Sequence, residues 1–385
     1  MRSTFAYQDN MVKPPLLYDK WFLFTVVSIV SLGLLMMTSA SIEVSEKQMH
    51  MPFYFLFKQL IYLIFGLAIG SVVLQLKTQF WERIGGYLLL INLFLLAAVL
   101  IPGIGHSVNG SMRWIGISFL TFQVSELTKF LVVIYMAGYL VRHQTEVSYT
   151  LTGFLKPFGV LCLIAILLLR EPDFGATVVV TGTTLGMLFL GGMRLRYFIM
   201  LLASVLLGLA IIAVSAPYRL LRLTSFLNPW AHPFDSGYQL TQSLIAFGRG
   251  GWFGLGLGGS IQKMFYLPEA HTDFLFAVIA EELGLVGMFV VILLFLTLII
   301  RIFLIGRQAQ LLDRHFQGLL AYGFGIWIAI QFIVNIGVNI GLLPTKGLTL
   351  PFMSYGGSSV LVNSLVIAVL LRIDHENRQK VLGFK

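Results

Sequence analysis

One carboxylate stands where a long polar segment turns into an apolar one, in the sequence LPEAHTDFLFAVIAEELG. This residue, Asp273, is preceded in the same polar segment by four cations, Arg219, Arg222, Arg249 and Lys263. A carboxylate can accept a proton while nearby cations hold negative charge, so the combination suits acid–base chemistry on an anionic substrate. The alternative is that Thr272 or Asp273 caps the helix that follows, because a side-chain oxygen there satisfies free backbone N–H groups.

Two further groups of charged residues lie earlier in the chain. Arg113 stands beside Trp114 in GHSVNGSMRWIGISF. An arginine there can donate two hydrogen bonds to a phosphate, or it can extend its charged end to the membrane interface beside an interfacial tryptophan. In QVSELTK, Glu126 and Lys129 are three residues apart and therefore lie on one helical face. Ionisable residues in apolar segments are costly, so they are candidates for substrate binding or for a neutral pair that joins two helices.

Later charged residues complete the set of candidates. Arg249 and Lys346, the second in LLPTKGLTLPFMSYGGSS, are further cations for an anionic substrate. Glu281 and Glu282 lie about 12 Å beyond the first carboxylate at 1.5 Å per helical residue. They are expected to neutralise Lys129 or another buried cation, and so to have a structural role.

Two motifs with glycine are interpreted as geometric rather than chemical. In REPDFG, Pro172 and Gly175 explain a short turn that carries Glu171 and Asp173. The small residues after Tyr355 allow a helix to approach its neighbours closely. Neither motif is assigned to the site.

The elements that must hold these residues are membrane-spanning helices. Hydrophobic residues make up 57% of the 385 residues and charged residues only 11%, whereas soluble domains typically have about 25% charged residues. Ten apolar runs are long enough to cross roughly 30 Å of hydrocarbon: Trp21–Ala40, Phe53–Leu76, Tyr87–Ile104, Phe122–Val141, Phe154–Leu169, Gly175–Gly192, Tyr197–Ala216, Phe274–Ile300, Gly318–Leu342 and Pro351–Leu371. We predict an all-α, polytopic membrane protein with one domain over residues 1–385.

The orientation follows from the lysines and arginines between these runs. With a cytoplasmic N-terminus, sixteen of the 26 cations lie inside and nine outside, and Lys129 falls within a helix. The positive-inside rule therefore places both termini, residues 1–20 and the tail 372–385, in the cytoplasm. Residues 217–271 form one long extracytoplasmic loop between the seventh and eighth helices.

Composition also excludes other classes of function. The single cysteine, Cys162, excludes an intrachain disulfide and a cysteine metal cluster. The net charge of +9 is explained by cytoplasmic loops rather than by nucleic-acid binding. No metal site is recognisable in the sequence, although a divalent cation such as Mg or Mn remains compatible with chemistry on an anionic substrate.

The chain resembles the SEDS family of bacterial shape, division and sporulation proteins over nearly its whole length. The resemblance is carried by GSMRWI, SELTK, EPDFG, NPWAHPFDSGYQLTQSLIAFGRGGWFGLGLG, YLPEAHTDFLFAVIAEELG and LPTKGLTLPFMSYGGSS. Ala270 before HTDF, and the sequence PTKG, indicate the division branch rather than the elongation branch. Val124, Ala176 and His232 depart from the usual family residues.

The resemblance implies a ten-helix peptidoglycan glycosyltransferase of the cytoplasmic membrane at the division septum. Such an enzyme polymerises lipid II and releases undecaprenyl pyrophosphate, together with a class B penicillin-binding transpeptidase (FtsI-like) and FtsQLB-like divisome regulators. It also implies that Asp273, the aspartate of HTDF, is catalytic. A lipid II flippase and a non-catalytic division scaffold are the alternatives.

These expectations combine into a mechanism. Asp273 takes a proton from the acceptor hydroxyl, and Arg113, Lys129, Arg249 and Lys346 stabilise the pyrophosphate leaving group. A position at a helix start would by itself hold the pKa of Asp273 low, and such a weak base can still work if a neighbouring charge or desolvation retunes its pKa.

Overall fold

The computed structural model describes residues 18–108, 111–117, 120–214, 225–345 and 347–383. Each predicted apolar run forms a helix: α1 (Lys20–Met49), α2 (Tyr54–Gln75), α3 (Thr78–Val99), α4 (Val124–Arg142), α6 (Leu151–Arg170), α7 (Phe174–Leu190), α8 (Leu195–Val214), α11 (Leu275–Leu311), α12 (His315–Asn339) and α13 (Gly357–Val381). Within these residues, eight helices are long and apolar enough to cross a membrane. The prediction of an all-α, multi-pass membrane protein is therefore confirmed.

The third helix and the segment after it differ from the prediction. Hydropathy predicts a helix over Tyr87–Ile104, but α3 begins at Thr78 and ends at Val99. The early start is stabilised by Glu376 of α13, which accepts hydrogen bonds from the Thr78 amide at 3.0 Å and its hydroxyl at 2.6 Å. The following segment, expected to be a loop, forms the antiparallel sheet β1 (Gly105–Val108), β2 (Ser111–Ile117) and β3 (Leu120–Gln123).

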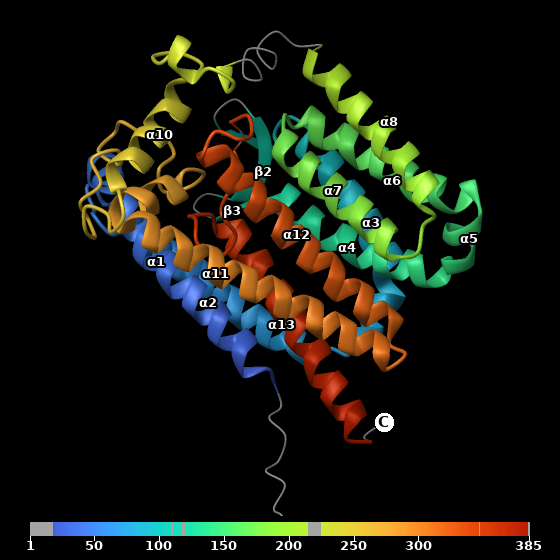
Figure 1. Ribbon diagram of the computed structural model, residues 1–385. Helices are drawn as coiled ribbons and strands as arrows, with labels where there is room; N and C mark the ends of the chain where they lie inside the picture. Colours follow the sequence, from blue (N-terminus) through green and yellow to red (C-terminus); the bar gives the residue numbers. More distant parts are fainter. Residues whose placement is uncertain (1–17, 109–110, 118–119, 215–224, 346, 384–385) are drawn as a thin grey trace, which may run out of the picture.

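Helices α4 and α12 form the centre of the bundle. Most of α4 is buried, and it packs against α3, α7 and α12, while α13 packs along α2 and α11 along α12 (Figure 1). Helices α1, α2 and α3 lie further out and expose large apolar side chains such as Phe24, Phe65 and Phe94. An exposed apolar surface of this kind is expected where lipid rather than water surrounds the helices.

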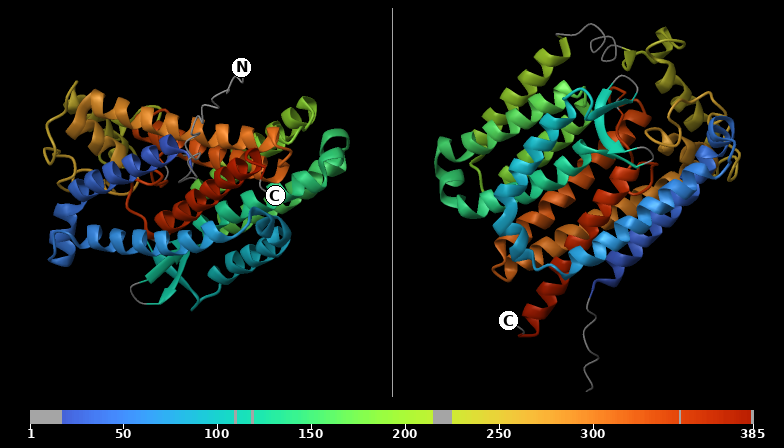
Figure 2. Two further views of the ribbon diagram at one scale, coloured as in Figure 1. Left: turned by 90° about the horizontal axis from the view of Figure 1, so that it is seen from below. Right: turned by 180° about the vertical axis from the view of Figure 1, so that it is seen from behind.

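The two ends of the bundle are built differently. The N-terminal end of α1 and the C-terminal end of α13 lie at one end, and the sheet and α10 (Tyr238–Gly250) lie at the other (Figures 1 and 2). The short helices α5 (Gln144–Tyr149) and η1 (Pro229–Ala231) connect longer elements. The placement of the start of α1 and the end of α13 on one side fits an even number of spans, and which side is cytoplasmic stays a prediction.

Helix α13 continues to Val381 and so includes most of the segment predicted as a cytoplasmic tail, residues 372–385. Ion pairs dock this part of α13 on the bundle. Asp374 accepts a hydrogen bond from the Asp19 amide at 2.7 Å, and Glu376 pairs with Arg314. The polar composition of the segment therefore serves helix packing rather than a solvated tether.

Candidate functional site

A cavity of about 670 Å³ lies at the end of the bundle that carries the sheet. Its wall is made by α2, β2, β3, the start of α4, the α6–α7 turn, the segment before α11 and the segment leading into α13. Three of the predicted site residues, Asp273, Arg113 and Glu126, line it. Residues separated by more than 140 positions in the sequence are therefore brought to one cavity.

Asp273 is held through its backbone and not through its carboxylate. Asn335 and Asn339 of α12 donate hydrogen bonds to its carbonyl oxygen at 3.0 and 3.1 Å. Its Oδ2 faces Gly347 so closely that a Cβ atom there would lie 2.8 Å away. Within the described residues, the carboxylate forms no hydrogen bond or ion pair. The side chain is therefore available to a substrate in the cavity.

The alternative that Thr272 or Asp273 caps the following helix does not hold. The N-cap residue of α11 is Phe274, which makes no side-chain cap hydrogen bond. The Thr272 hydroxyl instead donates to the Glu269 carboxylate at 2.7 Å. The helix start is fixed by α12, because the Asn339 side-chain oxygen accepts a hydrogen bond from the Ala277 amide at 3.1 Å.

The environment of Asp273 raises the pKa of its carboxyl group to about 7. Burial is the largest cause, because it penalises the charged form, and the negative charge of Glu269 adds to it, while Arg113 opposes the shift. Desolvation and a neighbouring charge therefore retune the pKa of Asp273 upward from the low value that a helix start would give by itself. A carboxylate with this pKa is suited to accept a proton near neutral pH.

Arg113 joins the sheet to the α6–α7 turn. Its Nε donates to the Glu171 carbonyl oxygen at 3.1 Å and its Nη2 to the Pro172 carbonyl oxygen at 2.6 Å. Its Nη1 lies 3.9 Å from Oδ2 of Asp173. A quarter of the side chain is still exposed, so the guanidinium can contact an anion in the cavity while its outer N–H groups stay anchored.

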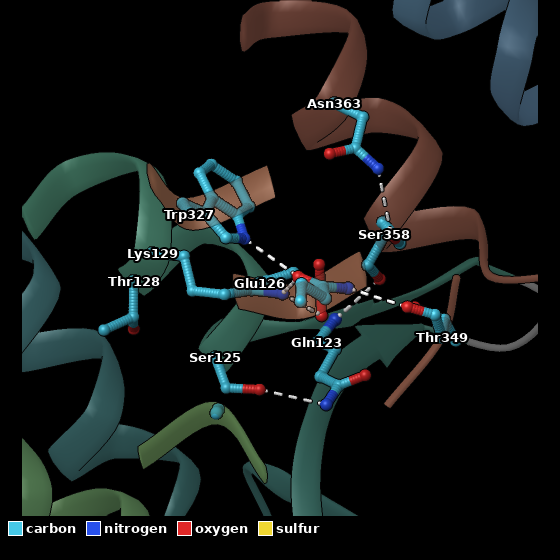
Figure 3. A network of polar contacts seen from close by, with 12 residues as sticks. Gln123, Ser125, Glu126, Thr128, Lys129, Trp327, Thr349, Ser358 and Asn363 are labelled. Carbon is cyan, nitrogen blue, oxygen red and sulfur yellow. Dashed lines mark hydrogen bonds and ion pairs between the residues drawn. The ribbon is translucent and has the colours of Figure 1, made fainter. Parts of the chain in front are cut away.

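Glu126 and Lys129 form a buried network behind the cavity wall (Figure 3). The Lys129 ammonium group donates to Glu126 at 2.8 Å and to Gln331 at 2.9 Å, and it lies 5.2 Å from the centre of the Trp327 ring. Glu126 lines the cavity, and its second oxygen is buried with no hydrogen-bond partner among the described residues. Lys129 does not line the cavity, and its link to the cavity wall is the hydrogen bond to Glu126.

These features can be compared with known proteins. Residues 20–379 match the model of the FtsW/RodA/SpoVE family, which is described as cell cycle proteins. The chain belongs to this family. The SEDS resemblance is therefore confirmed.

Curated relatives of this FtsW/RodA/SpoVE-family chain are similar over nearly their whole length. A protein of Legionella pneumophila is 56% identical, with 97% of this chain and 95% of that protein covered. A protein of Coxiella burnetii is 55% identical, with 93% and 96% covered. Both are named probable peptidoglycan glycosyltransferase FtsW, a name that agrees with the predicted division branch.

Solved structures of family members share the fold. A chain from a peptidoglycan synthase complex, described as coordinating polymerization and crosslinking, superposes with a TM-score of 0.77 at 26% identity, covering 94% of this chain and 99% of that one. The Thermus thermophilus rod shape determining protein RodA superposes with a TM-score of 0.69 at 27% identity, covering 94% and 97%. The polytopic architecture is therefore common to this family, although identity is low.

Four other charged residues singled out in the sequence of this family member lie elsewhere. Arg249 pairs with Glu281 at 3.0 Å, and Lys263 pairs with Glu282 at 2.7 Å. None of these residues lines the cavity. The glutamates were expected to neutralise Lys129 or another buried cation, and the second alternative is confirmed for Glu282, whose partner Lys263 is buried. The charge of Lys129 is compensated within α4 by Glu126.

Three candidate cations lie outside the described residues, namely Arg219, Arg222 and Lys346. Gly347 and Leu348, which follow the last of them, line the cavity.

Other residues of the cavity wall were not recognised in the sequence. Asp173, interpreted as part of a turn, accepts a hydrogen bond from Ser125 at 2.8 Å and caps α7 through the Ala176 amide at 3.0 Å. Ser358, interpreted as a packing residue, lines the cavity and accepts a hydrogen bond from the Gln123 amide at 2.8 Å.

Lys58 of α2 also lines the cavity, and it was not selected as a site candidate. Its contact among the described residues is the Tyr54 ring, whose centre lies 5.9 Å from the ammonium nitrogen. Lys58 falls within an apolar run, the same signal that selects Lys129 in the sequence, so sequence analysis could have found it.

Within the described part of the chain, no group of three or more His, Cys, Asp or Glu side chains could hold a metal ion. No described residue is therefore assigned as a ligand of Mg or Mn.

Proposed function

We propose that this chain is a peptidoglycan glycosyltransferase that polymerises lipid II into glycan strands and releases undecaprenyl pyrophosphate. The observation that carries this proposal is the Asp273 carboxylate, which has no partner among the described side chains and lines the same cavity as Arg113. Its pKa near 7 suits a general base. The names of the curated relatives support the same activity.

The reaction requires one proton transfer and one displacement. Asp273 takes the proton from the 4-hydroxyl group of the acceptor GlcNAc, and the resulting oxygen attacks the anomeric carbon of the donor MurNAc. The bond from that carbon to the pyrophosphate oxygen breaks, and undecaprenyl pyrophosphate leaves with the electron pair. A positioned base contributes about 10²–10⁴-fold to the rate of such a step.

The leaving group needs positive charge where the bond breaks. Arg113 and Lys58 line the cavity with Asp273 and are the cations best placed to contact the pyrophosphate. Lys129 orients Glu126 toward the same cavity from behind. Lys346 adjoins Gly347, whose Cα faces Asp273, and we retain it as a pyrophosphate ligand. Arg249 is a weaker candidate because it is paired with Glu281.

The setting of the reaction is part of the proposal. The chain acts at the division septum in the cytoplasmic membrane, with both termini in the cytoplasm and the cavity at the outer face. It works with a class B, FtsI-like transpeptidase and with FtsQLB-like regulators. Support for such an assembly comes from the structural similarity to a chain of a peptidoglycan synthase complex.

A flippase or a scaffold does not need a general base, and product analysis distinguishes these functions from polymerisation. Purified protein is incubated with lipid II in detergent, with and without the cognate transpeptidase, and the products are resolved as glycan strands on a gel. The proposal predicts strands longer than the disaccharide unit. Lipid II that stays unpolymerised in both reactions, with folded protein, would contradict it.

A further inference from the structure

The segment Gly251–Tyr266, here called the apolar loop, exposes large hydrophobic side chains. Trp252 is 70% exposed, Phe253 81% and Leu257 58%. Lys263 is the single charged residue in GWFGLGLGGSIQKMFY, and it is buried against Glu282. The exposed surface of the loop therefore carries no charged side chain, which is unusual for a segment that faces water.

The apolar loop is hydrogen-bonded to the interior of α11, where that helix is interrupted. Gly284 has φ 65° and ψ −162°, so the amides that follow it cannot bond within the helix. The Leu285 amide donates instead to the Gly251 carbonyl oxygen at 3.0 Å, and the Val286 amide donates to that of Trp252 at 3.1 Å. Such a break within a membrane span is tolerated where other groups satisfy the backbone.

The pairing continues on the other side of the break. The Leu255 amide donates to the Glu281 carbonyl oxygen at 2.9 Å, and the Gly256 amide donates to that of Glu282 at 3.0 Å. The two backbones approach closely, because a Cβ atom on Gly284 would lie 2.4 Å from the Gly254 nitrogen. The loop is therefore fixed against the middle of a helix rather than laid over its end.

The length of α11 sets the depth of this contact. Arg301 pairs with Asp19 at the opposite end of the bundle, just before α1 begins. Leu285 lies sixteen residues before Arg301 in continuous helix, a distance of about 24 Å at 1.5 Å per residue. A tilt of the helix reduces the component of this distance along the membrane normal. The hydrocarbon core is about 30 Å thick. A charged residue such as Arg301 is expected at the boundary of the hydrocarbon rather than inside it, which places the contact within the hydrocarbon thickness.

The exposed side chains of the loop continue the lipid-facing surface of α11. Leu285, Val286 and Phe289 are exposed on the helix directly after the break, where the loop is bonded to it. Further along the loop, the Lys47 ammonium group lies 4.2 Å from the centre of the Phe265 ring. A cation beside an aromatic ring is typical of headgroup depth. Figure 1 shows the loop after α10 beside the start of α11 and the end of α1.

We propose that the apolar loop is a re-entrant membrane segment whose exposed side chains contact lipid acyl chains in the leaflet nearer Asp273. The extracytoplasmic loop predicted over residues 217–271 then has two parts, of which the second lies in the bilayer. Lipid contact holds the loop against α11, and the Glu281 and Glu282 pairs hold it from beneath. The inference is independent of the proposed catalytic activity.

Collision with paramagnetic reagents tests this depth directly. The full chain with Cys162→Ala and Phe253→Cys is labelled with a nitroxide and placed in lipid nanodiscs without any partner protein. Oxygen concentrates in hydrocarbon, whereas the polar complex NiEDDA stays in water. Phe289→Cys is the reference for a lipid-facing site, and Asp235→Cys, in the same long loop and exposed, is the reference for water.

The proposal predicts that the label at Phe253 matches the label at Phe289. Its collision rate with NiEDDA should be about tenfold below that at Asp235, because polar groups are excluded from hydrocarbon. Leu257→Cys carries the same test if the first variant does not fold. Labels at both positions that match Asp235 would overturn the proposal and leave this face free for a partner protein.

Discussion

Two groups of carboxylates lie near the beginning of α11, and they differ in what surrounds them. Glu281 and Glu282 are fully buried, and each is saturated: the first by Arg249, Ser260 and two loop amides, the second by Lys263 and Ser39. Asp273 lines a cavity, and its carboxylate has no partner among the described residues. Proximity to cations is common to both groups, so it does not identify the reactive carboxylate.

The difference shows how one helix serves two purposes. The paired glutamates fix the apolar loop to α11, where an unpaired charge would be very costly. The aspartate is fixed through its backbone by two asparagines of α12, which leaves its side chain to the substrate. The comparison predicts that changes at the paired glutamates affect stability and that changes at Asp273 affect chemistry.

The largest expected effect is that of Asp273→Asn on strand synthesis. The amide keeps the shape of the side chain but cannot accept a proton, so we expect a rate lowered by about 10²–10⁴-fold. The thermal midpoint should change little, because the carboxylate forms no bond in the described structure. Asp235→Asn, an exposed aspartate in the same outer segment, is the matched control and should retain activity. Similar strand yields from the two variants would show that Asp273 is not the reactive carboxylate.

Glu282→Gln should have the opposite pattern. It leaves Lys263 buried without its ion-pair partner, a change that typically costs about 3–5 kcal/mol. We expect a clearly lower thermal midpoint in detergent, with normal strand synthesis per folded molecule. The double variant Glu282→Leu with Lys263→Met removes both charges and should recover most of the stability. A loss of activity without a loss of stability would assign this glutamate to the site instead.

Arg113→Gln tests the cation side of the cavity. Loss of one charge-stabilising donor commonly lowers the rate by about 10²-fold or more. Arg113→Lys keeps the charge but cannot donate both hydrogen bonds that the guanidinium makes to the carbonyl oxygens of Glu171 and Pro172. We therefore expect Lys to retain more activity than Gln at a similar thermal midpoint. Equal activity of the two variants, with equally lowered midpoints, would leave Arg113 with a role in anchoring the sheet only.

The smallest expected effect is that of Gly347→Ala. Its new Cβ atom would lie 2.8 Å from Asp273 Oδ2 and must displace the carboxylate, and we expect about tenfold slower synthesis because small misplacements of reacting groups are costly. Gly356→Ala is the control on the same cavity wall, since its Cβ atom would make only ordinary contacts, the nearest at 3.4 Å. Unchanged activity in both variants would show that the position of the carboxylate is not critical.

The sequence predicts the scaffold well because spanning a membrane requires long apolar runs, and each of the ten runs is a helix. It predicts boundaries less well where side chains distant in sequence decide them. The start of α3 at Thr78 depends on Glu376, 298 residues away. The sheet between α3 and α4 gives a weak signal, because its strands are short and interrupted by glycine.

For the site, residue type selected Asp273, Arg113 and Glu126, which do line one cavity. The sequence could not show which charges are already paired. Lys263 meets Ser39, 224 positions earlier, and such contacts leave no local pattern. For the same reason, the sequence could not show that the Asp273 carboxylate is unpaired. Its backbone is held instead by two asparagines of α12, which lie 62 and 66 residues later in the chain.

The most direct test of the central claim is the pH dependence of strand synthesis by the wild-type chain and by Glu269→Gln. The pKa of Asp273 is raised to about 7, and a base must be ionised, so activity should be full above this pH and fall as the pH drops through it. Glu269 contributes to the raised pKa. Its removal should therefore shift the fall in activity to lower pH.

If the fall in activity at low pH came from titration of the substrate, it would occur at the same pH in the Glu269→Gln variant. We expect activity to fall near pH 7 for the wild-type chain and at a lower pH for the Glu269→Gln variant. A fall at the same pH in the two proteins, or a rate that stays constant down to pH 5, would contradict the assignment of Asp273 as the general base.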